Sequence, residues 1–367
     1  MANYFIYGYY GFGNFGDDLL LEVLITEIRA RDPDAAFVIR ARTGVPKFEH
    51  DPKIRFLLLE SILEDQARSR FSRLRAYRAA MLDEVGRCDV FVIGGGTLFI
   101  DKGRLNWSLF FLHQAARAAR RAGRKVVVIG VAIDILAHPV SLWLTRQIFS
   151  LADFSAVRDT LSLAYFQDWG TPPRLSADLA WLQPLSVGGG APERRPVIGL
   201  NFIDYFRSST QSLEGHEAYR SALLRLVERY RDRYDFLLIA LQKGIGQRDD
   251  WFAEEYSALI PGGRVAYVND AMSLRYALEE VDAIVTTRFH LALLAARAGI
   301  PTCVIDHELK LTSLAQDLAL PSIPLSEFLR VDSEDPIERL KAWDAARTHV
   351  AAERIAERAT VNFQWMP

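Results

Sequence analysis

The chain has 367 residues, of which 50% are hydrophobic and 25% charged, and its formal net charge is −2. This length exceeds what a single hydrophobic core usually holds, so two domains are expected. The near-neutral charge gives no reason to expect a nucleic-acid partner. The sequence enters a strand pattern at once and its apolar runs are interrupted, so we expect neither a signal peptide nor a membrane span, and a cytoplasmic protein.

Short apolar runs alternate with stretches of helical period along the first half. Several of these runs are apolar almost throughout, as in strands that are buried on both faces of a parallel sheet. The strands are predicted at residues 3–8, 35–41, 54–59, 89–96, 125–131 and 154–159, with helices at 19–31, 63–86 and 106–123.

The composition changes at residues 186–195, which are polar and rich in glycine, and the alternation then restarts. Strands are predicted there at 197–202, 236–242, 264–270, 283–290 and 301–307, and a last helix near 336–360. The pattern is typical of α/β domains with doubly wound parallel sheets. We predict two Rossmann-like domains that face a cleft: 1–185, a linker at 186–195, 196–335, and a C-terminal helix in 336–367 that packs across both.

A glycine loop, GFGNFGDD, follows the first predicted strand. Its spacing is that of a dinucleotide-binding turn, and Arg40 and Arg42 after the second strand would suit a 2′-phosphate of NADP. However, at about 5 Å and an effective dielectric of about 20, each of Asp17 and Asp18 opposes a phosphate charge by about 3 kcal/mol. A helix dipole returns only about 0.3–1 kcal/mol. One aspartate can cap the helix, and we interpret the loop as binding a neutral polyol; a purely structural tight turn is the alternative.

A second candidate site follows the strand at 283–287. Arg288 and His290 lie where this strand meets a helix, at the edge at which parallel sheets bind ligands. A guanidinium, an imidazole and a helix N-terminus together suit an anion that carries a carboxylate and a phosphate. The next strand ends close to Lys310. The structural alternative is that Arg288 pairs with an acid of the fold and that His290 is a cap.

The histidines, the cysteines and an arginine-rich segment give weaker indications of function. The histidines, cysteines and acids show no metal-ligand spacing, so no metal is expected, and Cys88 and Cys303 are predicted to be buried thiols. The arginine-rich residues 67–78 predict a solvated helix face, with a dock for an anionic acceptor or a lipid surface as the alternative.

Four segments resemble the polysaccharide pyruvyl transferase family: GYYGFGNFGDD, GGGTLFID, AVRDTLS, and TTRFHLALLAARAGIP with HELK after the next strand. The resemblance implies a fold like that of two-domain glycosyltransferases of the B type. It also implies transfer of a pyruvyl group from phosphoenolpyruvate to a sugar, with formation of a ketal and release of phosphate, in the synthesis of exopolysaccharide or another cell-surface glycan.

The resemblance also implies roles for individual residues. Arg288, Phe289 and His290 match the family's R-L-H element, with Phe289 in place of leucine; Arg288 would bind phosphoenolpyruvate and His290 is the candidate acid/base. Lys310 matches the lysine after the next strand and would help to bind the donor. The acceptor side would comprise Asp17 as the catalytic carboxylate together with Gly13, Asn14, Gly16, Asp18 and Asp101.

Two departures concern the acceptor half: residues 130–135 replace a glycine-rich loop, and Asp18 stands where glutamate is common. The partners implied are phosphoenolpyruvate, as co-substrate with no further cofactor, and a glycan or lipid-linked oligosaccharide, with peripheral association at the inner membrane face. The alternatives are a B-type glycosyltransferase or epimerase that uses a nucleotide sugar, a non-catalytic protein that binds phosphorylated metabolites, and an NADP reductase.

Overall fold

The computed structural model describes residues 2–64, 69–101, 103, 105–185, 194–203, 206, 213–243, 248–331 and 334–367. It divides the chain into two compact units. The first unit comprises 1–12, 17–182 and 356–367, and the second comprises 13–16 and 183–355. Most of the expected linker, residues 186–193, lies outside the described residues.

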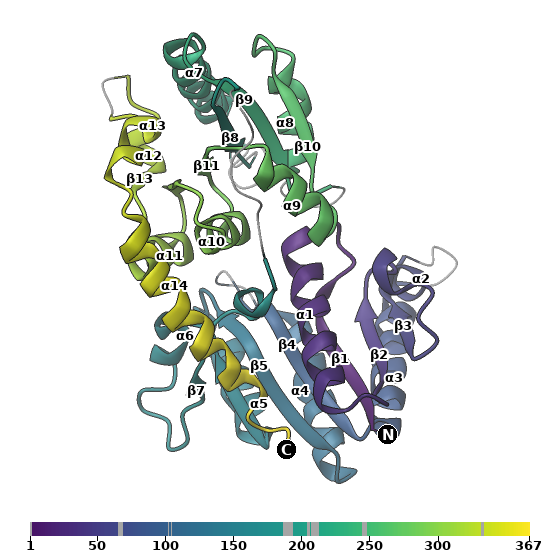
Figure 1. Ribbon diagram of the computed structural model, residues 1–367. Coiled ribbons are helices and arrows are strands. Elements are labelled where there is room, and N and C mark those ends of the chain that lie inside the picture. The colour runs from purple at the N-terminus through teal and green to yellow at the C-terminus, as the bar shows by residue number, and fades with distance from the viewer. Residues whose placement is uncertain are drawn as a thin grey trace. The chain divides into compact units, whose positions relative to one another are not determined.

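The first unit is built on a seven-stranded sheet in the order β3-β2-β1-β4-β5-β6-β7, and every pair of neighbours is parallel. Helices cover both faces of the sheet (Figure 1). The strands are β1 (Asn3–Tyr10), β2 (Ala36–Ala41), β3 (Ile54–Leu58), β4 (Val90–Phe99), β5 (Lys125–Ile133), β6 (Phe154–Val157) and β7 (Arg174–Leu175). The helices are α1 (Phe15–Arg31), α2 (Leu59–Leu63), α3 (Arg70–Arg87), α4 (Trp107–Arg121), α5 (Pro139–Leu151) and α6 (Thr160–Ala164).

The second unit repeats this plan with six parallel strands in the order β10-β9-β8-β11-β12-β13. The strands are β8 (Val197–Asn201), β9 (Asp235–Ala240), β10 (Arg264–Tyr267), β11 (Ala283–Thr286), β12 (Thr302–Asp306) and β13 (Ser322–Pro324). The helices are α7 (Leu213–Tyr230), α8 (Asp249–Ser257), α9 (Ala271–Glu279), α10 (Phe289–Arg297), α11 (Leu309–Leu318), α12 (Leu325–Phe328), α13 (Pro336–Arg339) and α14 (Ala345–Ala359). The last four residues of α14 belong to the first unit.

Both sheets confirm the doubly wound α/β prediction, and each has a point at which the strand order reverses. That point lies between β1 and β4 in the first unit and between β8 and β11 in the second. In open parallel sheets, ligands bind beyond the carboxyl ends of the strands at such a point. The sequence therefore places the glycine loop after one switch-point strand, β1, and Arg288 after another, β11.

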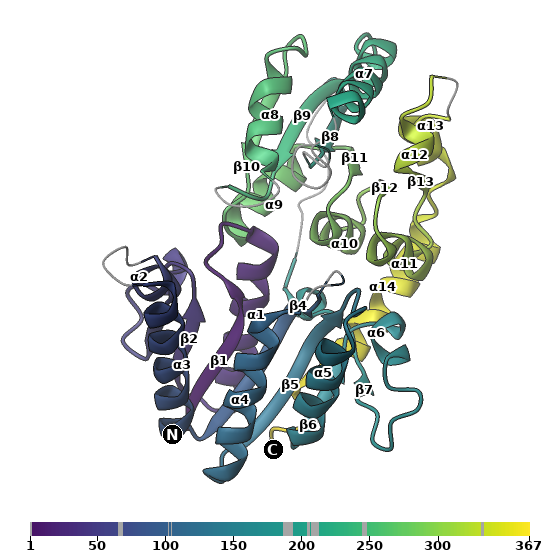
Figure 2. The same cartoon turned by 180° about the vertical axis from the view of Figure 1, so that it is seen from behind.

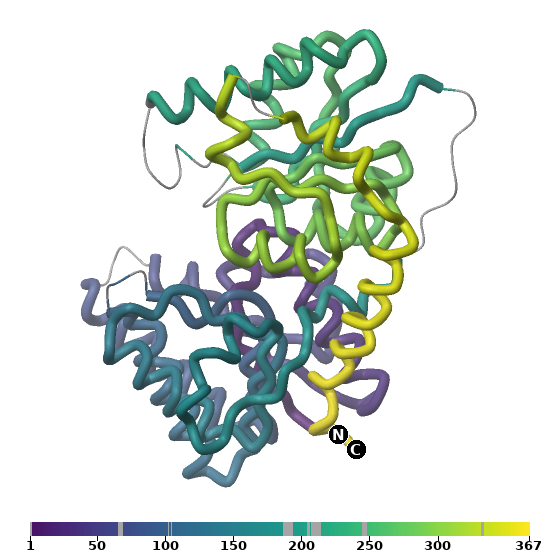
Figure 3. The backbone as a smooth tube through the Cα atoms, turned by 90° about the vertical axis from the view of Figure 1, so that its left-hand side faces the viewer, coloured from purple at the N-terminus to yellow at the C-terminus, as the bar shows by residue number. Residues whose placement is uncertain are grey.

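The C-terminal residues return to the first unit and pack beside the start of its first strand. The ring of Trp365 lies 6.4 Å from that of Tyr4, and Lys125 Nζ donates a hydrogen bond to the carbonyl of Trp365 at 2.7 Å. Figure 3 shows the yellow C-terminal segment ending in the first unit. The single helix expected near 336–360 is instead two helices, α13 and α14, because a 3-10 turn at Leu340–Ala342 separates them.

Two further predictions concern the cysteines and the lengths of the helices. Cys88 and Cys303 are both buried and reduced, which confirms their predicted role. Within the described ranges, no helix is both long and apolar enough to cross a membrane.

Candidate active site

Arg288 stands between a switch-point strand and a helix in the second unit. It follows β11 directly and is the N-cap residue of α10, with extended backbone angles. Its own N–H donates to Thr286 Oγ1 at 2.9 Å. The side chain is 15% exposed. The strand end and the helix N-terminus thus fix the position of this cation at the edge of the sheet where anions bind favourably.

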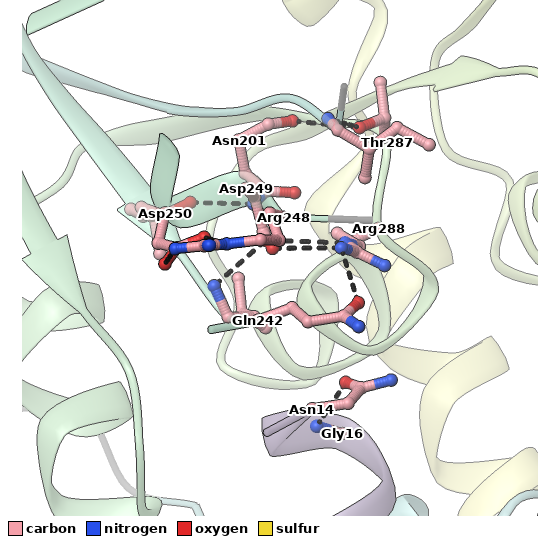
Figure 4. Close-up of polar contacts among 12 residues, drawn as sticks. Asn14, Gly16, Asn201, Gln242, Arg248, Asp249, Asp250, Thr287 and Arg288 are labelled. Carbon is pink, nitrogen blue, oxygen red and sulfur yellow. Dashed lines mark hydrogen bonds and ion pairs between the residues drawn. The ribbon is translucent and has the colours of Figure 1, made fainter. Parts of the chain in front are cut away.

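Two side chains hold the guanidinium: Gln242, which follows β9, and Asp249, which begins α8 (Figure 4). Arg288 Nη2 lies 2.9 Å from Asp249 Oδ1, and Nε lies 3.4 Å from Asp249 Oδ2. Nη2 also donates to Gln242 Oε1 at 2.9 Å. The carboxylate of Asp249 is only 1% exposed. Arg288 therefore does pair with a buried acid of the fold, as the structural alternative required, and this pairing sets the orientation of the guanidinium.

Asp249 is itself anchored by groups from two other strands. Its Oδ2 accepts a hydrogen bond from Asn201 Nδ2 at 3.1 Å and another from the N–H of Leu241 at 3.0 Å. Asn201 ends β8, and its Oδ1 accepts a hydrogen bond from Thr286 at 2.8 Å. The ends of β8, β9 and β11 are thereby joined in one polar network. Buried polar groups that satisfy one another in this way hold their geometry rigidly.

The segment Gly13–Gly16 belongs to this second unit although it lies near the N-terminus. The N–H of Lys243 donates to the carbonyl of Gly13 at 2.8 Å, and the N–H of Phe15 donates to the carbonyl of Leu241 at 2.9 Å. Asn14 forms an antiparallel bridge with Gln242. The glycine loop thus lies alongside the residues that follow β9, next to the network that holds Arg288 (Figure 4).

The helix cap differs from the prediction. The capping contact of α1 is made by Asn14, whose Oδ1 accepts a hydrogen bond from the N–H of Gly16 at 3.1 Å. The expectation that Asp17 or Asp18 caps this helix was wrong, since α1 begins at Phe15 and both carboxylates lie in its first turn. Negative charge in the first turn is favourable there because of the helix dipole.

Gly16 and His290 are in close approach within the second unit. A Cβ atom added to Gly16 would lie 2.0 Å from Nδ1 of His290, far closer than any side chain can be. Only glycine therefore fits against the imidazole. His290 is the second residue of α10, two residues after Arg288, and its ring lies 5.4 Å from that of Phe289. The second unit therefore brings together Arg288, His290 and Gly16 of the predicted site residues.

Lys310 belongs to a charged group at the end of β12. Its Nζ lies 2.9 Å from Glu308 Oε1. Burial would raise the pKa of Glu308, but Lys310, His307 and Arg288 outweigh it and lower this pKa. Burial lowers the pKa of His307, and the nearby Lys310 and Arg288 add to this effect while Glu308 opposes it. Arg288 and Lys310 thus act on the same two side chains, so both cations contribute to one electrostatic field.

Asp17 lies in the first unit beside the switch point between β1 and β4. A Cβ atom on Gly96, near the end of β4, would stand 2.9 Å from Asp17 Oδ1. Arg158 follows β6 and pairs with the buried Asp178 at 2.8 Å. Burial would lower the pKa of Arg158, but Asp178, Asp159 and then Asp17 raise it. The field of the guanidinium therefore reaches the carboxylate of Asp17 within this unit.

Asp18 is a partly buried carboxyl group whose pKa is raised. Burial raises its pKa to about 6, although the N–H of Gly11 donates to Oδ1 at 2.8 Å and works in the opposite direction. A carboxyl group that titrates near neutrality is a frequent feature of functional sites, and structural groups can show it too. The role of Asp18 in acceptor binding stays a prediction.

Asp101 has a structural task in the first unit. Its carboxylate accepts hydrogen bonds from the N–H groups of Gly103 at 2.7 Å, Ala137 at 3.0 Å and His138 at 2.9 Å. Burial would raise its pKa, but these three N–H groups lower it. The carboxylate fixes the loop that leads into α5. Its predicted contact with an acceptor gains no support from these bonds and stays a prediction.

The arginines considered for a 2′-phosphate are engaged elsewhere. Arg40 is buried, and it donates to the carbonyl of Gly8 at 2.7 Å and to the hydroxyl of Tyr77 at 3.2 Å. Arg42 pairs with Glu64. Both guanidiniums therefore serve the fold of the first unit, which weakens the interpretation of the glycine loop as an NADP site.

Asn201, Gln242 and Asp249 were missed in the sequence. Asn201 and Gln242 stand at the ends of predicted strands, which was a usable signal. Asp249 starts a helix after a loop, and nothing in the sequence pairs it with Arg288, which lies 39 positions later. Within the parts of the chain that the structure describes, no group of three or more His, Cys, Asp and Glu side chains could hold a metal ion.

Solved structures with a similar fold cover nearly the whole chain. UDP-GlcNAc 2-epimerase from Methanocaldococcus jannaschii is 11% identical, with a TM-score of 0.59 over 97% of this chain and 99% of that one. Sucrose-phosphate synthase from Thermosynechococcus elongatus is 15% identical, with a TM-score of 0.54 over 100% and 96%. MurG from Acinetobacter baumannii is 10% identical, with a TM-score of 0.52 over 100% and 98%. These neighbours confirm the B-type glycosyltransferase fold.

Sequence comparisons assign the family. No curated protein sequence matches the chain. The family model described as polysaccharide pyruvyl transferase matches residues 14–308, a span that runs from Asn14 of the glycine loop to Glu308 beside Lys310 and includes Asp249 and Arg288. Membership implies a transferase that acts on polysaccharide. The chain belongs to the polysaccharide pyruvyl transferase family.

Proposed function

We propose that this protein transfers a pyruvyl group from phosphoenolpyruvate to two hydroxyls of a glycan or lipid-linked sugar and so forms a ketal. The observation that carries the proposal is the arrangement around Arg288: a guanidinium oriented by Asp249 and Gln242, two residues from His290, at the switch point of the second sheet. Phosphoenolpyruvate carries a carboxylate and a phosphate on one small carbon frame. A pair of cations beside an imidazole suits such a ligand.

In the proposed complex, Arg288 and Lys310 bind the two anionic groups of the donor. Asp249 and Gln242 take up Nε and Nη2 of the guanidinium, which fixes the plane in which Arg288 meets the donor. A guanidinium that is already oriented loses less entropy when it binds an oxyanion. The Lys310 ammonium, which lies beside Glu308, would turn to the donor as a mobile point charge.

The chemical step needs a proton at carbon 3 of phosphoenolpyruvate. His290 would supply it, leaving a positive centre at carbon 2 that one sugar hydroxyl attacks with loss of its proton. The bond from carbon 2 to the phosphate oxygen then breaks, phosphate leaves with a proton, and the second hydroxyl closes the ketal. A positioned acid contributes about 10²–10⁴-fold to such a step. The reaction balances with donor and acceptor alone, so we propose no further cofactor.

On the acceptor side, Asp17 would orient or deprotonate the attacking hydroxyl. The guanidinium of Arg158 interacts electrostatically with this carboxylate, which in its ionised form accepts a proton or a hydrogen bond from a hydroxyl. Asp18, in the same helical turn, would bind a second hydroxyl of the sugar.

The first test is calorimetric titration of phosphoenolpyruvate into the wild type, Arg288→Ala and Arg275→Ala. Arg275 is a matched control in the same unit, half-exposed and paired with Glu279 along helix α9. We expect saturable binding to the wild type and to Arg275→Ala, and binding at least about a hundredfold weaker for Arg288→Ala. UDP-GlcNAc and NADP serve as control ligands.

Binding of UDP-GlcNAc in place of phosphoenolpyruvate would contradict the proposal in favour of a nucleotide-sugar enzyme. Hydride transfer with NADP would do so in favour of a reductase. The second stage measures phosphate release with phosphoenolpyruvate and a panel of glycans. Tight donor binding without phosphate release from any acceptor would support a non-catalytic binding protein instead, and a ketal signal in the product by NMR would establish the transfer.

A further inference from the structure

The first turns of three helices in the first unit expose large apolar side chains. Helices α3, α4 and α5 lie over the same face of the sheet (Figure 2). On them, Phe71 is 77% exposed, Trp107 60% and Trp143 52%. We call the following set the aromatic edge: Phe71, Trp107, Phe110, Ile135, Val140 and Trp143.

Ring contacts connect the aromatic edge across the three helices. Trp107 lies 5.9 Å from Phe110, which lies 5.9 Å from Phe111. Phe111 in turn lies 5.6 Å from Tyr77 of α3. On the other side of α4, His113 lies 5.6 Å from Trp143 of α5. These contacts join α3 to α4 and α4 to α5, the three helices that carry the exposed aromatic residues.

The same surface carries more arginines than acids: the acids of α3 are Asp83, which pairs with Arg87, and Glu84, which is buried and pairs with Arg55. Arg70, Arg75 and Arg78 are exposed on α3, and Arg117 is exposed on α4. Neither α4 nor α5 contains an aspartate or a glutamate. Of the two acids in the preceding loops, Asp101 is buried and accepts backbone hydrogen bonds, and Asp134 accepts one from the N–H of Ile135.

We propose that the aromatic edge and its arginines dock the protein on an anionic lipid bilayer. Tryptophan and phenylalanine insert at the level of the head groups, and arginines around them are attracted to anionic lipids. A solvated helix face alone would not require exposed tryptophans. The helices α4 and α5 offer no acid to pair with the arginines of a second copy of the chain. The combination of exposed apolar side chains with an excess of arginines favours the lipid surface.

This docking has a consequence for the proposed acceptor. Helices α3, α4 and α5 begin at the carboxyl edge of the sheet, the edge at which Asp17 and Gly96 lie. A sugar carried by a membrane lipid would therefore be presented to the same edge of the first unit. The docking itself involves no donor residue and holds whether or not phosphoenolpyruvate is the donor.

The test is co-sedimentation of the full chain with phosphatidylcholine vesicles, with and without phosphatidylglycerol. We expect the wild type to bind the anionic vesicles and to lose binding at high salt. Arg70→Glu/Arg75→Glu and Trp107→Ser/Trp143→Ser should each bind at least about tenfold more weakly. Trp251→Ser, which removes a half-exposed tryptophan from the second unit, is the matched control and should bind like the wild type.

Circular dichroism and thermal melting check that every variant is folded, which the exposure of the replaced side chains leads us to expect. Two outcomes would overturn the proposal: a wild type that ignores anionic vesicles, or double variants that bind as well as Trp251→Ser. If sedimentation equilibrium instead finds a dimer that only the tryptophan variants convert to a monomer, the aromatic edge is a contact between copies.

Discussion

Asp249 and Asp250 are adjacent buried carboxylates with different arginine partners. Asp249 holds Arg288, whereas Asp250 holds Arg248. Asp249→Asn keeps the shape of the side chain but removes the charge that orients the guanidinium. Because hydrogen bonds to charged groups contribute about 1.5–3 kcal/mol, we expect phosphoenolpyruvate binding to weaken by about tenfold to a hundredfold, measured by calorimetry.

Asp250→Asn is the matched control for this prediction. It also removes a buried acid from its arginine partner, Arg248, so both variants should lose stability on denaturant unfolding. Only Asp249→Asn should lose donor affinity beyond this common effect. Equal losses of affinity in the two variants would show that Asp249 acts through general stability rather than by positioning Arg288.

Gly16→Ala tests the close approach of the glycine loop to His290. The new methyl group would lie 2.0 Å from Nδ1 of His290, so the imidazole must move. We expect phosphate release to fall by at least about tenfold in kcat, in keeping with loss of a positioned acid. Gly86→Ala in α3 is the control, because its Cβ would contact nothing within 4 Å.

The control variant Gly86→Ala should itself change the stability of the protein in a predictable direction. Alanine is favoured over glycine inside a helix by about 1 kcal/mol, so Gly86→Ala should be slightly more stable and fully active. If Gly16→Ala retains wild-type kcat, the position of His290 against the loop is irrelevant to the reaction and another acid must be sought.

Asp18 makes stability depend on pH. Its folded-state pKa is raised to about 6 from an ordinary value of 3.8 by burial. Between these values the folded chain binds more protons than the unfolded chain, so the free energy of unfolding falls as the pH rises from about 4 to about 6. The loss, at most about 3 kcal/mol for a shift of this size, should be absent in Asp18→Asn.

Urea unfolding of both proteins between pH 4 and pH 8 measures this difference. The amide oxygen of the variant can still accept from the N–H of Gly11, which keeps the comparison close to one of charge alone. We expect the two stabilities to converge near pH 4 and the variant to be the more stable above pH 6. Parallel profiles would show that Asp18 remains ionised through this range.

At the scale of the elements, the longer strands could be predicted from the sequence, whereas two very short strands and a break in the last helix could not. The apolar runs of the longer strands predicted both parallel sheets, because strands buried on both faces need continuous apolar sequence. The two-residue strand β7 and the three-residue strand β13 have too few residues to show a pattern. The last helix was predicted as one, but residues 340–342 form a tighter turn between α13 and α14.

The candidate site also contains residues that the sequence could predict and residues that it could not. Arg288, His290 and Lys310 could be picked out because each follows a predicted strand. Asp249 could not, since its pairing with Arg288 depends on the three-dimensional order of β8, β9 and β11. The grouping of Gly13–Gly16 with the second unit was equally hidden, because the loop is more than 200 residues away from its partners Leu241 and Lys243 in the sequence.

Asp101→Ala tests whether the segment before α5 depends on one carboxylate. The substitution removes the acceptor of three backbone hydrogen bonds, from Gly103, Ala137 and His138. At about 1 kcal/mol or more for each bond, we expect the free energy of unfolding to fall by about 2–4 kcal/mol. Asp134→Ala, which removes a single local bond to Ile135, should cost less than about 1 kcal/mol.

Donor affinity separates the structural role of Asp101 from a role in the site. The bonds of Asp101 all lie in the first unit, whereas Arg288 and Lys310 lie in the second, so calorimetric binding of phosphoenolpyruvate should be unchanged in Asp101→Ala. A loss of acceptor-dependent phosphate release larger than that of an equally destabilised variant would restore the acceptor role predicted from the sequence.

For the whole molecule, the division of the chain predicts which amides the donor protects from hydrogen exchange. The residues that would hold phosphoenolpyruvate, and the loop Gly13–Gly16, all belong to the second unit. A ligand that binds only the folded state raises its stability by RT ln(1 + [L]/Kd), about 2.7 kcal/mol at a hundredfold excess over Kd. Local opening of the donor-binding segments should become about a hundredfold rarer at this donor concentration.

We therefore expect phosphoenolpyruvate to slow exchange at 241–243, 286–292 and 306–310, and also at Gly13–Gly16, which donates to and accepts from the backbone at 241 and 243. The strands β4, β5 and β6 of the first unit should exchange as before. The Arg288→Ala variant should show none of these changes, and Arg275→Ala all of them. Protection of Gly13–Gly16 only after a glycan is added would instead assign this loop to the acceptor, as its sequence first indicated. The loop would then bind a different substrate from the one bound by the donor residues next to it in the second unit.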